Sequence, residues 1–237
     1  WSINEYIAEK PVLDGSIGMN SLFAIPGYYL VEECSATSAG NLEWFVNTLM
    51  KNYPVPEGRR IYEITDELVQ SVEPEKSDVY FLPFLYGSFG HPLGKGAFVG
   101  LTTFHELSHM LRAVYEGVAY SHKTHIDRLL SSRPAPRAVR MAGGAVNSPF
   151  WVQMFADVLD LPIETVGVKE LGALGAAMAA AIAAGAFTGY REAARAMVRI
   201  GGVVEPNSER TEVYREKYRK YTAVRKALEG VWENFKI

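Results

Sequence analysis

Residues 96–116 decide the fold, and they read GAFVGLTTFHELSHMLRAVYE. The ends of this stretch predict a glycine-flanked strand at 97–101, a turn, and a long helix from Phe104 to about Leu130, whose apolar residues keep the helical period. The middle contains His105-Glu106-Leu107-Ser108-His109, the HExxH pattern of zinc hydrolases. The two interpretations lead to different functions, and the rest of the chain has to separate them.

The zinc interpretation needs a third metal ligand. An HExxH pattern on a helix places two imidazoles one turn apart, with the glutamate as general base beside a metal-bound water. On a helical projection His105 and His109 lie opposite the apolar stripe, with Arg112 and Glu116, so we expect this face to be accessible. Glu116 lies about 10 Å along the axis from His109, too far for a zinc–carboxylate bond of about 2 Å. Other candidates would have to fold back: His91, His122, His125 and Asp127. We therefore expect two solvated histidines and keep a zinc hydrolase as an alternative.

The composition narrows the class of protein. With 237 residues and 48% hydrophobic content, the chain can bury the core of one large domain or two small ones. A net charge of −3 argues against nucleic acid or a membrane surface as partner. Cys34 is the single cysteine, which excludes an internal disulfide and fits the cytoplasm. The opening residues show no signal peptide and no initiator methionine, so we expect a fragment.

Alternation and helical periodicity predict the order of elements. The uncharged stretch Leu171 to Tyr190 is rich in alanine and glycine, which predicts a buried, closely packed helix and not a membrane span. Three strands separated by turn-formers open the chain, and strands then alternate with helices, which predicts an α/β domain with a mixed sheet. The expected strands are 1–7, 19–25, 28–34, 79–85, 97–101, 138–141 and 163–166. The expected helices are 41–51, 61–72, 104–130, 149–159, 171–184, 191–200 and 209–235.

One strand-to-helix turn has the chemistry of a nucleotide site. Gly143 and Gly144 join a strand to a helix where a backbone without Cβ atoms can approach a flat ligand, and where amides at a helix N-terminus bind phosphates. A structural explanation is equally open, because Ser148 before Pro149 is a good N-cap followed by proline at the first helical position. Residues 90–95, by contrast, lack the serine or threonine of a P-loop and lead into a strand.

Several motifs, taken in order, resemble the C-terminal domain of the FGGY family of carbohydrate kinases over nearly the whole chain. They are the opening Trp1-Ser-Ile-Asn4, the turn and helix at 38–44, the segments 82–101 and 109–116, Gly143-Gly144-Ala145 with Ser148, Trp151 and Gln153, the small-residue stretch 174–177, and the Tyr214, Tyr218, Tyr221 series. The resemblance implies an actin-like, ribonuclease H-like fold, with residues 1–237 as the ATP-binding C-terminal domain. The helix at 209–235, which interleaves basic and acidic residues, is then an amphipathic helix packed on this domain.

The resemblance also implies a site and a reaction. Ala39 and Gly40 would line one side of an adenosine pocket, Gly143, Gly144 and Ala145 would lie against the base, and Ser148 would form a hydrogen bond near it. The full-length protein would use ATP and Mg²⁺ to phosphorylate a sugar hydroxyl, and the stretch 27–33 resembles L-xylulose (pentulose) kinases.

The same resemblance implies what this chain does not carry. The family's catalytic aspartate and its Gly-Thr phosphate turn would precede Trp1, and the sugar would bind an N-terminal domain outside the chain. We therefore expect no catalytic residue and no metal ligand in residues 1–237, no activity of the fragment alone, and a possible homodimer through outward helix faces. A non-catalytic nucleotide-binding module remains a further alternative.

Overall fold

The N-terminal part of the protein is an antiparallel sheet. The computed structural model describes residues 2–13, 15–88, 90–131, 133–168 and 170–235, so Trp1 and Asp14 of the expected strand and turn lie outside the described residues. Strands β1 (Ser2–Ala8), β2 (Met19–Leu22) and β3 (Tyr29–Ser35) pair in the order β1-β3-β2, with Tyr6 opposite Val31. β1 turns the polar Ser2 and Asn4 inward and leaves Ile3 and Ile7 exposed. Polar partners must therefore lie beneath this strand.

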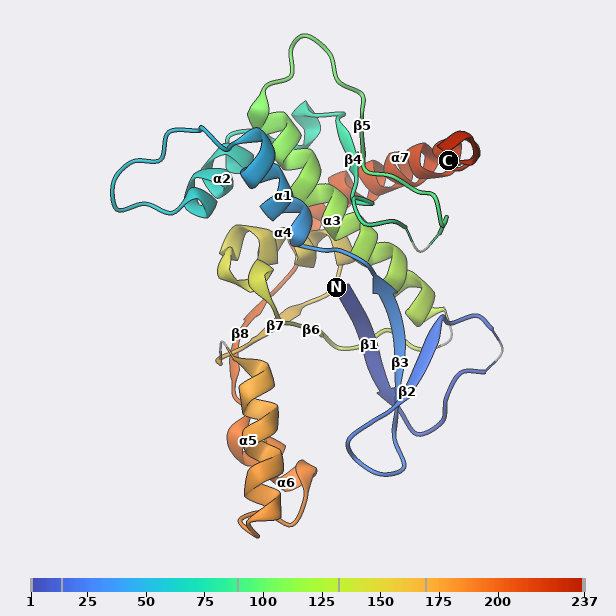
Figure 1. The fold of residues 1–237 in the computed structure, drawn as a ribbon, viewed down its shortest axis with the longest axis vertical. Helices are drawn as coiled ribbons and strands as arrows, with labels where there is room; N and C mark the ends of the chain where they lie inside the picture. The colour runs from blue at the N-terminus through green and yellow to red at the C-terminus, as the bar shows by residue number, and fades with distance from the viewer. Residues whose placement is uncertain (1, 14, 89, 132, 169, 236–237) are drawn as a thin grey trace.

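Helix α3 (Leu107–Leu130) is the centre of the fold (Figure 1). Its 24 residues span about 36 Å at 1.5 Å per residue. It packs against β1, β3 and β4 (Tyr80–Leu82) and against four helices that surround it. These helices are α1 (Gly40–Leu49), α2 (Ile61–Gln70), α4 (Pro149–Leu159) and α7 (Ser208–Trp232). β4 pairs antiparallel with β5 (Ala97–Val99). Phe45, Leu82, Leu111 and Val114 are among the fully enclosed residues of this core.

Two expectations about α3 are wrong. The helix begins at Leu107, so Phe104 lies outside it and is 87% exposed, and His105 precedes the first turn. Arg112 and Glu116, which share the face expected to be accessible, are only 3% and 1% exposed. Their charges are matched inside the core by each other and by Lys217 of α7. The apolar stripe alone therefore does not show which faces of this helix are buried.

The C-terminal part contains a mixed sheet, as expected for an α/β domain. β6 (Val139–Met141) runs parallel to β7 (Ile163–Val166), and β7 pairs antiparallel with β8 (Ile200–Val204). β8 was not expected, because its sequence Ile200-Gly-Gly-Val-Val204 follows α6 (Tyr190–Met197) without a clear break. A Cβ on Gly201 would meet the backbone nitrogen of Gly167 at 3.1 Å, so glycine here permits the close approach of β8 to the end of β7.

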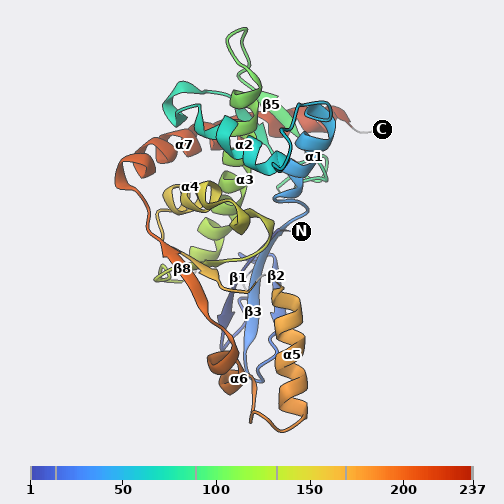
Figure 2. The same ribbon diagram turned by 90° about the vertical axis from the view of Figure 1, so that its left-hand side faces the viewer.

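Helix α5 (Leu171–Ala183) extends away from the core together with α6 (Figures 1 and 2). We expected it to be buried, but Met178 is its only buried residue and most of its alanines are exposed. Its main contacts are with α6, so no sheet face covers it. At the tip of this α5–α6 arm, Arg191 lies over the ring of Tyr28 at 4.9 Å and donates a hydrogen bond to its hydroxyl.

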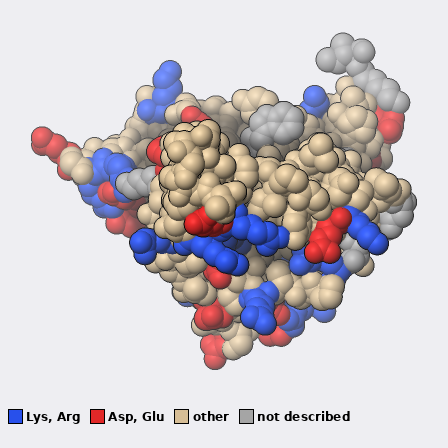
Figure 3. All heavy atoms as spheres, turned by 90° about the horizontal axis from the view of Figure 1, so that it is seen from below, with Lys and Arg blue, Asp and Glu red and all other residues tan. Residues whose placement is uncertain are grey.

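The surface carries no single dominant charge on the face seen from below. Lysine and arginine side chains are interspersed there with aspartate and glutamate over a largely uncharged surface (Figure 3). Among the residues that the structure describes, no helix combines the length and the apolarity needed to cross a bilayer.

Candidate functional site

Two strand-to-helix turns meet at the site. The first joins β3 to α1, where Ala39 is the N-cap residue and Gly40 opens the helix. The fully buried Asn41 holds this turn, because its amide donates to Thr37 Oγ1 at 3.1 Å and to the Ser38 carbonyl at 2.8 Å.

The second turn joins β6 to α4. Gly143 has φ = 99°, in the left-handed region that favours glycine. A short 3-10 turn at Gly144–Asn147 follows, and Ser148 then caps α4 by accepting a hydrogen bond from Trp151 N at 3.0 Å. The structural explanation of Ser148 and Pro149 is thus confirmed. It does not exclude a binding role, because the cap fixes how the glycines are presented.

Two pockets adjoin at these turns. The β1–β6 pocket has a volume of about 280 Å³ and is lined by Ile3 and Asn4 of β1, by β6, and by Gly143 and Ala145. The α1–α2 pocket has a volume of about 330 Å³ and is lined by residues of α1 and α2 and by Ser148. Ala39, Gly40 and Gly144 line both pockets, and we call this shared wall the ridge. The structure therefore brings together all the residues that the sequence proposed for binding.

The β1–β6 pocket has a polar wall that sequence reasoning missed. His122 of α3 contacts Asn4 Oδ1 through Nδ1 at 2.8 Å and Ser38 Oγ through Nε2 at 2.8 Å. Burial lowers the pKa of His122 to about 4, with repulsion from His125 as a second cause, so the ring is neutral at pH 7. The signal in the sequence was the alternation of polar residues in β1, which requires a polar partner on the covering helix.

The α1–α2 pocket combines aromatic rings with charged groups. Tyr115 and Trp151 line it, with ring centroids 4.3 Å apart and planes 31° from parallel. Asp66 accepts a hydrogen bond from the Tyr115 hydroxyl at 2.8 Å, and Arg60 pairs with Glu63 at 2.8 Å. Such a pocket can hold a planar ring and form hydrogen bonds with its edge.

Comparison with known proteins identifies this arrangement. The family model for the C-terminal domain of the FGGY family of carbohydrate kinases matches residues 1–184. The chain belongs to the FGGY family. It is 35% identical over 204 residues to the L-xylulose/3-keto-L-gulonate kinase of Escherichia coli (strain K12), covering 86% of this chain and 39% of that protein. It is also 35% identical over 210 residues to a probable L-xylulose kinase of Pasteurella multocida (strain Pm70), covering 88% and 40% of the two chains.

A solved structure confirms the fold of the FGGY domain. The crystal structure of xylulose kinase from Rhodospirillum rubrum superposes with a TM-score of 0.83 at 26% identity, over 98% of this chain and 46% of that one. The expectation of an actin-like α/β fold is therefore confirmed. The chain spans about 40% of the length of the curated relatives that it matches.

In the FGGY domain the HExxH segment is not a metal site of the expected kind. His105 lies before α3, so the two imidazoles are not one helical turn apart, and their ring centroids are 5.2 Å apart in an edge-to-face arrangement. His105 Nδ1 accepts from Thr102 N at 2.9 Å and His109 Nδ1 from Glu106 N at 3.2 Å. Nowhere in the described ranges do three or more His, Cys, Asp or Glu side chains come together in a way that could hold a metal ion.

Proposed function

We propose that this domain binds the adenine nucleotide of a carbohydrate kinase that transfers the γ-phosphate of ATP to a sugar hydroxyl. The observation that carries the proposal is the ridge of Ala39, Gly40 and Gly144 between two adjoining pockets. Family membership supplies the class of reaction. The E. coli and P. multocida relatives bear names that specify L-xylulose, which supports a pentulose as the sugar.

The two pockets suggest how the nucleotide lies. The adenine ring suits the α1–α2 pocket, whose lining includes the packed rings of Tyr115 and Trp151 together with Ser148 and Asn147. The ribose and phosphates would then cross the ridge toward the β1–β6 pocket. Helix α1 begins at Gly40 on this ridge, and the positive end of its helix dipole favours phosphate oxygens. His122 is neutral, so the helix dipole and Arg140, which also lines the β1–β6 pocket, supply the positive charge of that pocket.

Magnesium does not fit the residues of this pocket alone. The described residues that line the β1–β6 pocket include no carboxylate, whereas Mg²⁺ in kinases is held by one or two carboxylates together with substrate phosphates. In our proposal the ion would arrive with the nucleotide, and carboxylates for it would come from the part of the kinase outside these residues. The group that orients the attacking sugar hydroxyl is assigned to that part as well. This domain alone should therefore bind nucleotide without turnover.

A pocket-filling substitution tests the proposal. A Cβ on Gly144 would meet no atom within 4 Å, so Gly144→Val should fold normally while its side chain occupies the ridge. We expect the Kd for ADP, measured by isothermal titration calorimetry, to rise at least about 10-fold, which corresponds to about 1.4 kcal/mol. Gly230→Val is the matched control, because Gly230 also has open space around it but lies on α7 away from both pockets.

Two outcomes of these ADP titrations would contradict the proposal. Unchanged ADP affinity in Gly144→Val would remove the ridge from the nucleotide site. Absence of ADP binding both to this domain and to the kinase extended by its preceding residues would remove the proposed function itself. With the extended protein, coupled detection of ADP release in the presence of L-xylulose and of other pentuloses tests the choice of sugar.

A further inference from the structure

A second hydrogen-bonded histidine lies one turn farther along α3, away from the nucleotide pockets. His125 contacts Glu33 Oε2 through Nδ1 at 3.2 Å and forms a hydrogen bond with Ser35 Oγ through Nε2. Glu33 is 1% exposed, and its carboxylate also accepts from Gly18 N at 3.0 Å and pairs with Arg128 at 3.3 Å. Ser35, His125 and Glu33 thus form a chain from a hydroxyl through an imidazole to a fixed carboxylate.

The geometry fixes where the protons lie. A carboxylate that is held by Arg128 and a backbone amide is an acceptor, so His125 Nδ1 carries the ring proton and donates it to Glu33. The lone pair of Nε2 then faces Ser35, and the hydroxyl donates. Burial lowers the pKa of His125, against the opposing effect of Glu33, so at neutral pH the imidazole is a free base. This is the arrangement in which a histidine can remove a proton from a serine.

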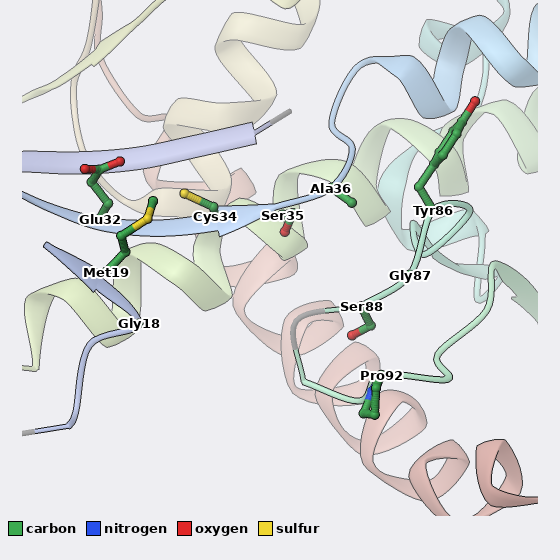
Figure 4. A pocket seen from close by; sticks show the side chains of 10 residues that line it. All are labelled: Gly18, Met19, Glu32, Cys34, Ser35, Ala36, Tyr86, Gly87, Ser88 and Pro92. Atoms are coloured by element: carbon green, nitrogen blue, oxygen red, sulfur yellow. The ribbon is translucent and has the colours of Figure 1, made fainter. Parts of the chain in front are cut away.

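Ser35 lies on the wall of a pocket of its own. Figure 4 shows β3 on one side of this pocket and the loop that carries Tyr86 and Pro92 on the other. The volume is about 420 Å³, and the wall is mainly apolar, with Met19 and Cys34 contributing sulfur atoms. Glu32 is the charged group of this wall, which disfavours anionic ligands.

The neighbouring hydrogen-bonded series of Ser38, His122 and Asn4 differs from that of Ser35 in its third residue. It has the same serine–histidine contact on the same helix, but its third member is a neutral amide, which cannot stabilise an imidazolium as a carboxylate does. The pKa of His122 falls to about 4, so its ring is a very weak base. The protein therefore contains one serine whose histidine is backed by a carboxylate and a matched serine whose histidine is backed by a neutral amide.

We propose that Ser35 is the nucleophile of a second site, which accepts acyl groups from short, uncharged esters. Ser35 Oγ attacks the ester carbonyl carbon while its proton passes to His125 Nε2. The bond from that carbon to the alcohol oxygen then breaks, and His125 returns the proton to the leaving alcohol, which gives acyl-Ser35. Water then attacks the acyl carbon and gives a proton to His125 Nε2, which passes it to Ser35 Oγ as the acyl–oxygen bond breaks, releasing the carboxylic acid and the serine hydroxyl.

Active-site labelling tests the proposal on this chain. A fluorophosphonate probe should react at Ser35, where Oγ forms a bond to phosphorus as fluoride leaves, and peptide mass spectrometry should find the label on Ser35 and not on Ser38. We expect Ser35→Ala to abolish labelling and His125→Gln to slow it by about 100-fold or more, the usual loss for a general base. His109→Gln, the same change on the same helix without contact to Ser35, should leave the rate unchanged.

The dependence on pH distinguishes a base from a structural contact. The charges around His125 come from Glu33 on β3, Arg128 and His122 on α3, and Arg225 on α7. The labelling rate of the unmodified protein should rise as His125 loses its proton, with a midpoint below the ordinary histidine pKa of about 6.5, and should be constant above pH 7. Absence of label on Ser35 in the folded protein would overturn the proposal. A labelling rate that does not change with pH as His125 loses its proton would also overturn it, whether or not His125→Gln folds.

Discussion

Glu116 is a carboxylate enclosed by two cations. Its oxygens contact Arg112 Nε at 2.8 Å and Lys217 Nζ at 2.9 Å, and the side chains of all three residues are at most 6% exposed. Lys217 also donates to the carbonyls of Pro74 and Ser77, and Arg112 to the hydroxyl of Tyr214. The cluster ties α3 to α7 and to the segment after α2. Glu116 is the carboxylate that pairs with both cations of this cluster.

Removing this charge should destabilise the protein strongly. Breaking a buried ion pair on one side costs about 3–5 kcal/mol, because an uncompensated charge stays in the core. We expect Glu116→Gln to lower the free energy of unfolding in urea by about that amount. Glu67→Gln removes a carboxylate that pairs with Arg59 but is 60% exposed, and it should lower the free energy of unfolding far less, because solvent screens an exposed ion pair. Equal costs for the two variants would contradict this account of Glu116.

His122 should make the stability depend on pH. The folded ring binds a proton only near pH 4, whereas the unfolded residue does so near its ordinary value of 6.5. As the pH falls below 6.5 the unfolded state therefore gains protons first, and the free energy of unfolding decreases. Between pH 7 and pH 5 this residue alone should account for a loss of about 2 kcal/mol. Urea unfolding of His122→Gln should show a loss smaller by this amount, and identical losses would count against the buried neutral ring.

At the scale of elements, one glycine sets the distance between α3 and β4. A Cβ on Gly117 would meet the Phe81 carbonyl oxygen at 2.3 Å, whereas a Cβ on Gly230, in α7, meets no atom within 4 Å. Alanine favours a helix over glycine by about 1 kcal/mol. We expect Gly230→Ala to raise the melting temperature and Gly117→Ala to lower it, with an overpacking cost of about 1–3 kcal/mol. A stabilising Gly117→Ala would show that α3 and β4 can separate without loss.

Comparison of the predicted and observed elements shows which features of the fold the sequence could predict and which it could not. Periodicity located α1, α2, α4 and α7 well, because one face of each packs on the core. Periodicity did not predict that Arg112 and Glu116 are buried. Their charges are paired between helices far apart in the sequence, and a local pattern contains no information about such pairs. Periodicity also failed for β8, whose glycines carry no strand signal, and for α5, because an alanine-rich helix looks the same whether or not a partner covers it. The glycines of the proposed binding site could be predicted because a turn such as that at Gly143, with φ = 99°, favours glycine. The place of His122 could not, because it depends on contacts made across the fold.

At the scale of the whole molecule, the α5–α6 arm has few buried contacts with the rest of the described structure. Most of α5 is exposed, and the tip of the arm is joined to the β2–β3 turn by Arg191 and Tyr28. Segments with few buried contacts open locally at low free energy. Amide hydrogen exchange should therefore be faster in α5 and α6 than in the enclosed α3.

The contact between Arg191 and Tyr28 at the tip should contribute measurably to the slow exchange of amides in α6. Cation–π contacts and exposed polar contacts are each worth about 0.5–1 kcal/mol. We expect Arg191→Ala to speed exchange in α6 by about 5-fold, the factor that corresponds to about 1 kcal/mol, and to leave α3 unchanged. Unchanged exchange in α6 would show that the contact between Arg191 and Tyr28 does not hold the arm.

The ridge of Ala39, Gly40 and Gly144 has a consequence for ligand design. Two small fragments, one in each neighbouring pocket, would touch the same three residues from opposite sides. A short linker over the ridge would then join them at high effective concentration, and the gain in affinity would come without any new contact. Because these residues present little side-chain bulk, the linker itself would meet mostly backbone, and its length would matter more than its chemistry.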